Sequence, residues 1–479
     1  MRYNKIIFSS ILLLSLFSCK KVIEVKETDF IGGELALKTV ANNEQGIIGA
    51  YAGLGTEMGI LLNATFSDEV KKGEFYNAAT THEWQYTSTD ITIRDNFTAF
   101  NAYYRIVDRV NRVLQALPKA DSTKAGDEVL RARLRGEALF LRAFCHFELY
   151  RYYCANYDAA GVALAYMETP SLEPKARIAM AAYFAKLNAD LAEAKNLLPN
   201  NLADIARATK LAATGLQARI ALYTKDWTNA IAYSTEYING LPLSPRASFA
   251  GIWTDANGNE TAFKLKRTSS IGTRIGSLFR ATSTKAANGD TLIGTITWLP
   301  SDKLWASFDQ ANDIRFSTYL KNEPILVKAG RPSQIIQKYA GTAYTSSAEN
   351  VADGKIFRTG EMYLIRAEAK AETADLAGAA ADINALRTAR INGYTNITYA
   401  SKDLAITDIM LERFRELAFE SHRFWDLKRR ALAVDRLSSD APAATAVTLP
   451  AGNFRFLLPI PNTEIKANAL ITQNPGYSN

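Results

Sequence analysis

The sequence predicts a mostly α-helical protein, a scaffold of helical hairpins into which a lobe of loops and short β-strands is inserted. Apolar residues recur at helical spacing in both the early and the late part of the chain. Two stretches join such helices through a short turn, and a central stretch rich in Gly, Ser, Thr and Asn carries β-like runs. A chain of 479 residues is also longer than one ordinary core requires, so several subregions are expected.

Residues 1–18 are predicted to be an export signal. Two basic residues precede an apolar run that ends at Phe17, and the run is shorter than the roughly 20 residues that span a bilayer. The letters LFSC at its end resemble a bacterial lipobox, which predicts cleavage before Cys19 and acylation of its thiol. An ordinary signal that places Cys19 there by chance is the alternative. Residues 19–34 would then form a lipidated tether.

Residues 35–240 are predicted to form the first helical half. Helical patterns cover YYRIVDRVNRVLQAL, VLRARLRGEALFLRAFCHFELYRYY, and residues 176–198 and 209–239. The second of these is apolar nearly all round, which predicts burial of most of its surface. Within 209–239, small residues and a turn at Thr224 to Asp226 indicate a hairpin of tetratricopeptide type. A polar, aromatic-bearing insert at 66–97 interrupts this half.

Residues 241–356 are predicted to form the irregular lobe, with strands at TAFKLKR, TLIGTITWL and PILVKAG. Residues 357–479 form a second helical half, in which MYLIRAEAKAETADLAGAAADINALRTAR at 362–390 predicts another hairpin. Stacked hairpins present a curved face that suits a protein partner. Loops on such a frame are where binding residues are expected.

The stretch LERFRELAFESHRFWDLKRR at 411–430 concentrates charge, and on a single helix it would be amphipathic. One stripe would contain Glu412, Glu416, Glu420, Arg423 and Asp426, and the opposite face Leu411, Phe414, Leu417, Ala418 and Trp425. Paired carboxylates raise the alternative of a glycosidase, but the pattern supplies neither a pocket nor a pKa difference. Phe419 and Leu427 interrupt the charged stripe, so we expect a partly covered structural ion-pair network, including a Glu420–Arg423 pair.

Other function classes find little support. The three histidines, His82, His146 and His422, are widely separated and no Cys/His spacing resembles a zinc site, so neither a metal nor a cofactor is expected. The formal net charge of +7 is spread through the helices, without a nucleic-acid-binding motif. We therefore expect a non-catalytic protein that does not bind nucleic acid.

Five blocks of the sequence together resemble the SusD/RagB family of outer-membrane nutrient-binding lipoproteins from Bacteroidetes. The blocks are RGEALFLRAFCHFELYRYY (135–153), FRTGEMYLIRAEA (357–369), DINALRTAR (382–390), the charged stretch at 411–430, and LLPIPNTEIKANALITQNPGY (457–477). They occur in the family's order behind the lipobox-like signal. One departure is that Lys20 and Lys21 follow Cys19, where surface-exposed lipoproteins of this phylum often carry acidic residues.

The resemblance implies a helical fold with about four tetratricopeptide-like units and a variable lobe. It also implies a lipid-anchored protein on the outer membrane, exposed at the cell surface. Such a protein captures glycans or oligosaccharides, or in some members peptides, and delivers them to a SusC-like TonB-dependent transporter.

Sugar binding without chemistry needs flat aromatic faces and a few polar groups in a shallow cleft. The resemblance places such a site in the early insert and the lobe. The candidates there are Trp84, Tyr86, Asp68, Arg94, Asn96, Trp298 and Trp305. For each aromatic residue, a place in the core is the competing interpretation. The alternative for the whole protein is a peptide-capturing receptor or a tetratricopeptide-type interaction scaffold.

Overall fold

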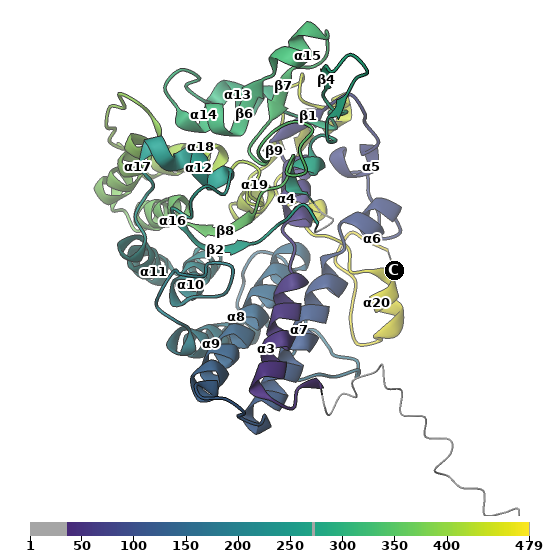
Figure 1. Cartoon of the computed structure of the whole chain (residues 1–479), viewed down its shortest axis with the longest axis vertical. Helices are drawn as coiled ribbons and strands as arrows, with labels where there is room; N and C mark the ends of the chain where they lie inside the picture. Colours follow the sequence, from purple (N-terminus) through teal and green to yellow (C-terminus); the bar gives the residue numbers. More distant parts are fainter. Residues whose placement is uncertain (1–35, 271–273, 479) are drawn as a thin grey trace, which may run out of the picture.

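The computed structural model describes residues 36–270 and 274–478. The expected signal peptide, Cys19 and the tether lie outside the described residues. In the described part, helices predominate and the strands are short, in agreement with the predicted fold class. Figure 1 shows a helical part at the bottom, formed by α3, α7, α8 and α9, and the lobe with α13, α14 and α15 at the top.

The helices fall into two groups, those before the lobe and those within or after it. In the first group they are α3 (Val40–Ala52), α4 (Glu57–Phe66), α5 (Ala79–His82), α6 (Ile91–Asn96), α7 (Ala99–Ala116), α8 (Asp127–Tyr153), α9 (Met180–Leu197), α10 (Lys210–Thr224) and α11 (Trp227–Gly240). In the lobe and beyond they are α12 (Phe249–Trp253), α13 (Asp302–Ser307), α14 (Ile314–Tyr319), α15 (Pro324–Lys328), α16 (Thr359–Glu372), α17 (Leu376–Arg390), α18 (Lys402–Glu416), α19 (Arg423–Arg429) and α20 (Asn462–Ala467).

Both predicted hairpins are confirmed. Helices α10 and α11 pack against each other across a two-residue turn, in which Lys225 adopts a left-handed conformation (φ 58°) and the Asp226 side chain caps α11. Helices α16 and α17 form the second hairpin, and α11 packs against α16. The two hairpins, far apart in sequence, are thereby stacked side by side, as in a helical solenoid.

Helix α8 is the central helix of the first group. It contacts α3, α7 and α9, and from Gly136 to Tyr153 every residue is buried, which confirms the expectation from its all-round apolar pattern. The segment Val40–Phe66 has the length and composition of a membrane span. In this fold it is two helices, α3 and α4, and α3 packs against α7 and α8.

Among the described residues, the strands form five antiparallel two-stranded ribbons. They pair as β1 (Val70–Lys72) with β5 (Trp298–Pro300), β2 (Thr261–Leu265) with β8 (Gly354–Arg358), β3 (Thr284–Lys285) with β4 (Thr291–Leu292), β6 (Leu320–Asn322) with β7 (Gln334–Ile336), and β9 (Val434–Asp435) with β10 (Thr448–Leu449). The strand predicted at TAFKLKR is confirmed as β2. The strand predicted at PILVKAG is wrong, because this run forms α15, with Pro324 in its first turn and the Glu323 side chain as its N-cap.

Of the four hydrophobic clusters among the described residues, the two largest join parts of the chain that are far apart in sequence. The larger lies among the helices of the first group and α16, and the second lies beneath the lobe. In the second core, Trp253 and Tyr319 of the lobe lie edge to face, and Phe414 and Phe419 of the C-terminal half belong to the same cluster. The lobe is therefore packed onto the C-terminal helices.

Candidate functional site

The structure brings the early insert and the lobe together. Strand β1, at the start of the insert, pairs with β5 of the lobe, so that Lys72 lies opposite Trp298 and Val70 opposite Pro300. The candidates near residue 84 and near residue 298 thus meet at one junction, although more than 200 residues of chain separate them. What the junction offers a ligand depends on which side chains reach its surface.

Trp84 and Tyr86 lie in the core beneath this junction. Trp84 is 4% exposed, donates its indole N–H to the Phe66 carbonyl at 2.9 Å, and has the Arg436 guanidinium 4.1 Å from its ring centre. Tyr86 is 1% exposed and donates its hydroxyl to the Arg455 carbonyl. In this conformation both residues tie the insert to the C-terminal segment, and a ligand role for them stays a prediction.

The two lobe tryptophans differ in exposure. Trp298 is buried, with its ring 4.9 Å from His82 and 6.1 Å from Tyr76. Trp305 is half-buried and meets Phe316 edge to face at 4.8 Å. Phe75, which the sequence interpretation missed, is 57% exposed in the insert. An aromatic residue within the polar run GEFYNA is the signal that could have identified it.

Asp68 is buried and its carboxylate is already paired. Arg423 Nε lies 2.7 Å from one oxygen and Lys303 Nζ 2.7 Å from the other. Burial alone would raise the pKa of Asp68, but the two cations outweigh it and hold the pKa well below its usual range. The expected Glu420–Arg423 pair is therefore wrong, because Arg423 is engaged with Asp68.

Arg94 is exposed on α6 and lines a cavity of about 240 Å³ between the insert and the C-terminal segment. Phe97 and Pro461 are among the apolar walls of this cavity. The backbone of Asn96 closes α6, whereas its side chain lies outside what the structure describes. Ligand contacts by Arg94 and Asn96 remain predictions.

The charged stretch at 411–430 is not one helix. Helix α18 ends at Glu416 and α19 begins at Arg423, and the connection contains Phe419 and Ser421 with positive φ angles of 62° and 68°. The break turns Glu420 away from the direction that a continuous helix would give it. The helical-wheel prediction was wrong on this point.

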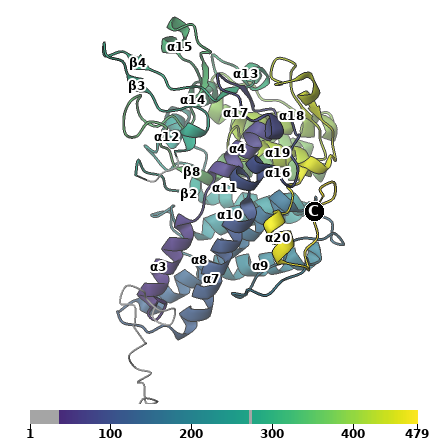
Figure 2. The same ribbon diagram turned by 90° about the vertical axis from the view of Figure 1, so that its right-hand side faces the viewer.

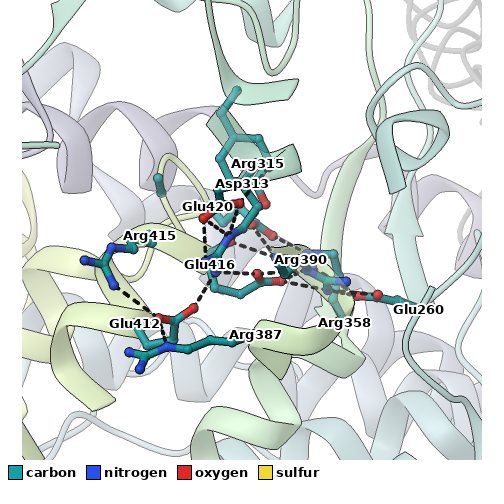
Figure 3. A network of polar contacts seen from close by, with 12 residues as sticks. Glu260, Asp313, Arg315, Arg358, Arg387, Arg390, Glu412, Arg415, Glu416 and Glu420 are labelled. Atoms are coloured by element: carbon teal, nitrogen blue, oxygen red, sulfur yellow. Dashed lines mark hydrogen bonds and ion pairs between the residues drawn. The ribbon is translucent and has the colours of Figure 1, made fainter. Parts of the chain in front are cut away.

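The predicted ion-pair network is confirmed, and Figure 3 shows its centre. Glu416 is fully buried and contacts three arginines, Arg315, Arg358 and Arg390, each at 3.0–3.1 Å. Further pairs join Arg315 to Glu412 (2.6 Å), Arg387 to Glu412 (2.8 Å), Arg358 to Glu420 (2.6 Å), Lys338 to Glu420 (2.7 Å) and Arg390 to Glu260 (2.8 Å). Residues from the lobe, α17 and α18 thus neutralise one another in the interior.

Glu412 is unsuited to general acid catalysis. Burial raises the pKa of Glu412, but the nearby guanidinium groups of Arg315, Arg387 and Arg415 outweigh it and hold the pKa at about 2. A general acid must carry a proton near neutral pH. Glu412 therefore stays ionised as part of the scaffold. In residues 36–270 and 274–478, no cluster of three His, Cys, Asp or Glu side chains is arranged to hold a metal ion.

The lobe itself contains an open cleft of about 410 Å³. Its lining includes the half-buried ring of Tyr344, the hydroxyls of Thr254 and Ser317, and the amide of Gln337. Trp253 also lines this lobe cleft, and its buried indole N–H finds no acceptor among the described residues. Aromatic and hydroxyl groups in a concave site are what sugar recognition uses.

The structure has the features of a helical binding protein: stacked hairpins carry a lobe, and the lobe contains a ligand-sized cleft. Two family models match this chain: residues 283–477 match the SusD family, and residues 34–222 match a SusD-like family described as starch-binding and associating with the outer membrane. The chain belongs to the SusD/RagB family.

Individual relatives agree over the full length. The chain is 25% identical over 538 aligned positions to SusD-like protein P2 of Formosa agariphila, covering 100% of both chains. The crystal structure of a SusD superfamily protein from Bacteroides thetaiotaomicron superposes with a TM-score of 0.78 at 20% identity, covering 91% of this chain and 100% of the other. A SusD-like carbohydrate binding protein from Bacteroides vulgatus gives a TM-score of 0.72 at 20% identity, covering 90% and 97%. These similarities establish the shared fold.

Proposed function

We propose that this protein is a non-catalytic, lipid-anchored receptor that captures glycans or oligosaccharides at the outer membrane. In this proposal it passes them to a SusC-like TonB-dependent transporter. Family membership is the observation that carries the proposal. The carbohydrate-binding description of one structural relative and the starch-binding description of one family model support the ligand class.

Within this function, we assign ligand contact to the lobe cleft. In this proposal the Tyr344 ring offers an aromatic face, and Thr254 and Ser317 offer polar contacts. Phe75 and the half-buried Trp305 can extend the surface at the insert–lobe junction. A Trp84→Ala variant would be a poor probe, because removing a buried indole tests core packing before it tests binding.

Titration with maltoheptaose and a panel of other oligosaccharides should therefore show saturable binding without turnover. Tyr344→Ala is expected to raise Kd roughly five- to tenfold for the oligosaccharide that binds, because the variant loses the aromatic contact. Tyr394→Ala is the matched control. Like Tyr344, Tyr394 is half-buried and donates its hydroxyl to a side chain, which for Tyr394 is that of Asn384 at 3.0 Å. If no oligosaccharide binds, or if both variants weaken binding equally, the lobe cleft is not the glycan site.

The anchor makes a separate prediction. Acylation at Cys19 should keep the mature protein in the membrane fraction, because two or three acyl chains give stable attachment. Cys19→Ala is expected to abolish labelling by a clickable palmitate analogue, because the acylated thiol is gone. Cys145→Ala, which removes a buried thiol, should leave the labelling unchanged. Labelling of Cys19→Ala protein at the level of the parent would contradict the lipid anchor.

A further inference from the structure

A second cavity, of about 440 Å³, lies on the helical half between α7, residues 165–175 and the C-terminal residues 464–471. We call it the α7 cavity. Helix α20 lies beside α7 in Figures 1 and 2, on a different part of the molecule from the lobe. The floor consists of Phe100, Tyr104 and Val107, which share one face of α7. The proposed glycan function does not use this cavity.

The walls of the α7 cavity are held by specific hydrogen bonds. Asn111 of α7 donates its amide to the Met167 carbonyl at 2.8 Å, and Asn468 donates its amide to the Lys175 carbonyl at 2.9 Å. Both asparagine side chains are buried. The two irregular segments are thus fixed to the helix and to each other, so the cavity has a defined shape.

These bonds also determine what the interior can recognise. The remaining acceptor of Asn111 is taken by Arg142 at 3.0 Å, and that of Asn468 by the Leu470 backbone N–H at 3.1 Å. The Tyr104 hydroxyl donates to a backbone carbonyl of the adjacent wall at 2.8 Å. The polar groups of Asn111, Asn468 and Tyr104 are therefore occupied, and the apolar surface of the floor remains. A sugar ring would find few partners for its hydroxyls there, whereas an apolar group would lose nothing by entering.

The mouth of the α7 cavity is charged, in contrast to its apolar floor. Arg105, Lys175, Glu173 and Glu464 line it, and among the described residues none of the four forms a salt bridge. Leu172, on the rim, is fully exposed. Unpaired charges of both signs around an apolar floor complement a ligand that carries donors, acceptors and both charges on either side of an apolar group. A fatty acid would use the cations alone.

We propose that the α7 cavity binds an extended polypeptide segment, with one aliphatic or aromatic side chain in the cavity and its backbone across the charged mouth. Met167 in the wall suits such a site, because methionine adapts to side chains of different shape. The occupant is a free peptide, because its ammonium and carboxylate ends match the two signs of charge at the mouth. A segment within a larger protein lacks these charged ends.

Calorimetric titration of the mature protein with defined pentapeptides tests the proposal. Ala-Ala-Leu-Ala-Ala is expected to bind at least tenfold more tightly than Ala-Ala-Ser-Ala-Ala, the factor that burial of a leucine side chain implies. Ala467→Trp should fill the cavity and weaken binding at least tenfold. Ala377→Trp on α17 is the matched control, since both alanines are exposed on helices, and it should leave Kd unchanged.

The same peptide with acetylated and amidated ends distinguishes the sources. Tenfold weaker binding of the capped peptide supports a free peptide as the occupant, and equal binding overturns it in favour of an internal segment of a protein. The proposal is overturned if the leucine and serine peptides bind equally, if Ala467→Trp leaves Kd unchanged, or if decanoate binds and neither peptide does. Oligosaccharide titration of Ala467→Trp, expected to be unchanged, separates this result from the glycan proposal.

Discussion

Replacing Arg358 by methionine is expected to lower the free energy of unfolding by about 3–5 kcal/mol, the range for breaking a buried ion pair. Arg358 is 1% exposed and pairs with Glu420 at 2.6 Å and with Glu416 at 3.0 Å. Without this guanidinium, the remaining cations no longer balance the negative charge of the two glutamates, and the site is closed to water. Urea denaturation should show a lower midpoint with an unchanged m-value.

The control is Arg112→Met, which breaks an exposed pair with Asp108 on α7. Its expected effect is below about 0.5 kcal/mol, because exposed pairs contribute little. Adding Glu420→Met to Arg358→Met should cost less than the sum of the single changes, since the second substitution removes a charge that the first left uncompensated. Stability of Arg358→Met within about 0.5 kcal/mol of the parent would show that the network does not hold the structure together.

The second large effect depends on pH and concerns Glu69. Glu69 is 1% exposed and accepts one hydrogen bond, from the Phe419 backbone N–H at 3.0 Å. Burial raises the pKa of Glu69 from 4.5 to about 8, against the opposing effect of that hydrogen bond. The folded protein therefore binds more protons than the unfolded chain between these two pH values. The associated stability is complete below pH 4.5 and is lost as pH rises through 8.

Glu69→Gln keeps the acceptor for Phe419 and removes the ionisation. We expect the variant to gain on the order of 3 kcal/mol of unfolding free energy relative to the parent between pH 5 and pH 8. Denaturation series at several pH values measure this gain. Glu412→Gln is the contrasting control: with a pKa of about 2, Glu412 is ionised throughout, so this variant should be destabilised by a constant amount. Parallel pH profiles for Glu69→Gln and the parent would refute the assignment.

The hairpins could be predicted from the sequence because their formation depends on residues that are close together in the chain. In α10 and α11, apolar spacing, a short turn and a capping aspartate all lie within about thirty residues. The run PILVK is ambiguous by the same logic, because a short apolar run fits a strand or a buried helix. Its N-terminal proline and the preceding glutamate favour the helix that is observed.

The candidate site was harder to predict because burial there depends on distant residues. Asp68 is matched by Arg423 across 355 positions, and Trp84 is covered by Arg436 from the far end of the chain. No local sequence pattern contains these contacts. Aromatic and acidic residues in the polar insert therefore look the same in the sequence whether they are buried or exposed. A ligand site in the insert and the lobe stays a prediction, and the sequence did not show which of the candidate residues are exposed.

The ion-pair network has a consequence for how the molecule unfolds. Arg315 comes from the lobe, Arg387 and Arg390 from α17, and Glu412 and Glu416 from α18 (Figure 3). Lys338, also of the lobe, pairs with Glu420. Separating the lobe from the helices would leave these buried charges without their partners. The lobe and the C-terminal helices should therefore open as one cooperative unit in hydrogen exchange. The outer ribbon of β3 and β4 contains none of these residues. Substitutions in this ribbon would therefore leave every ion pair of the network in place.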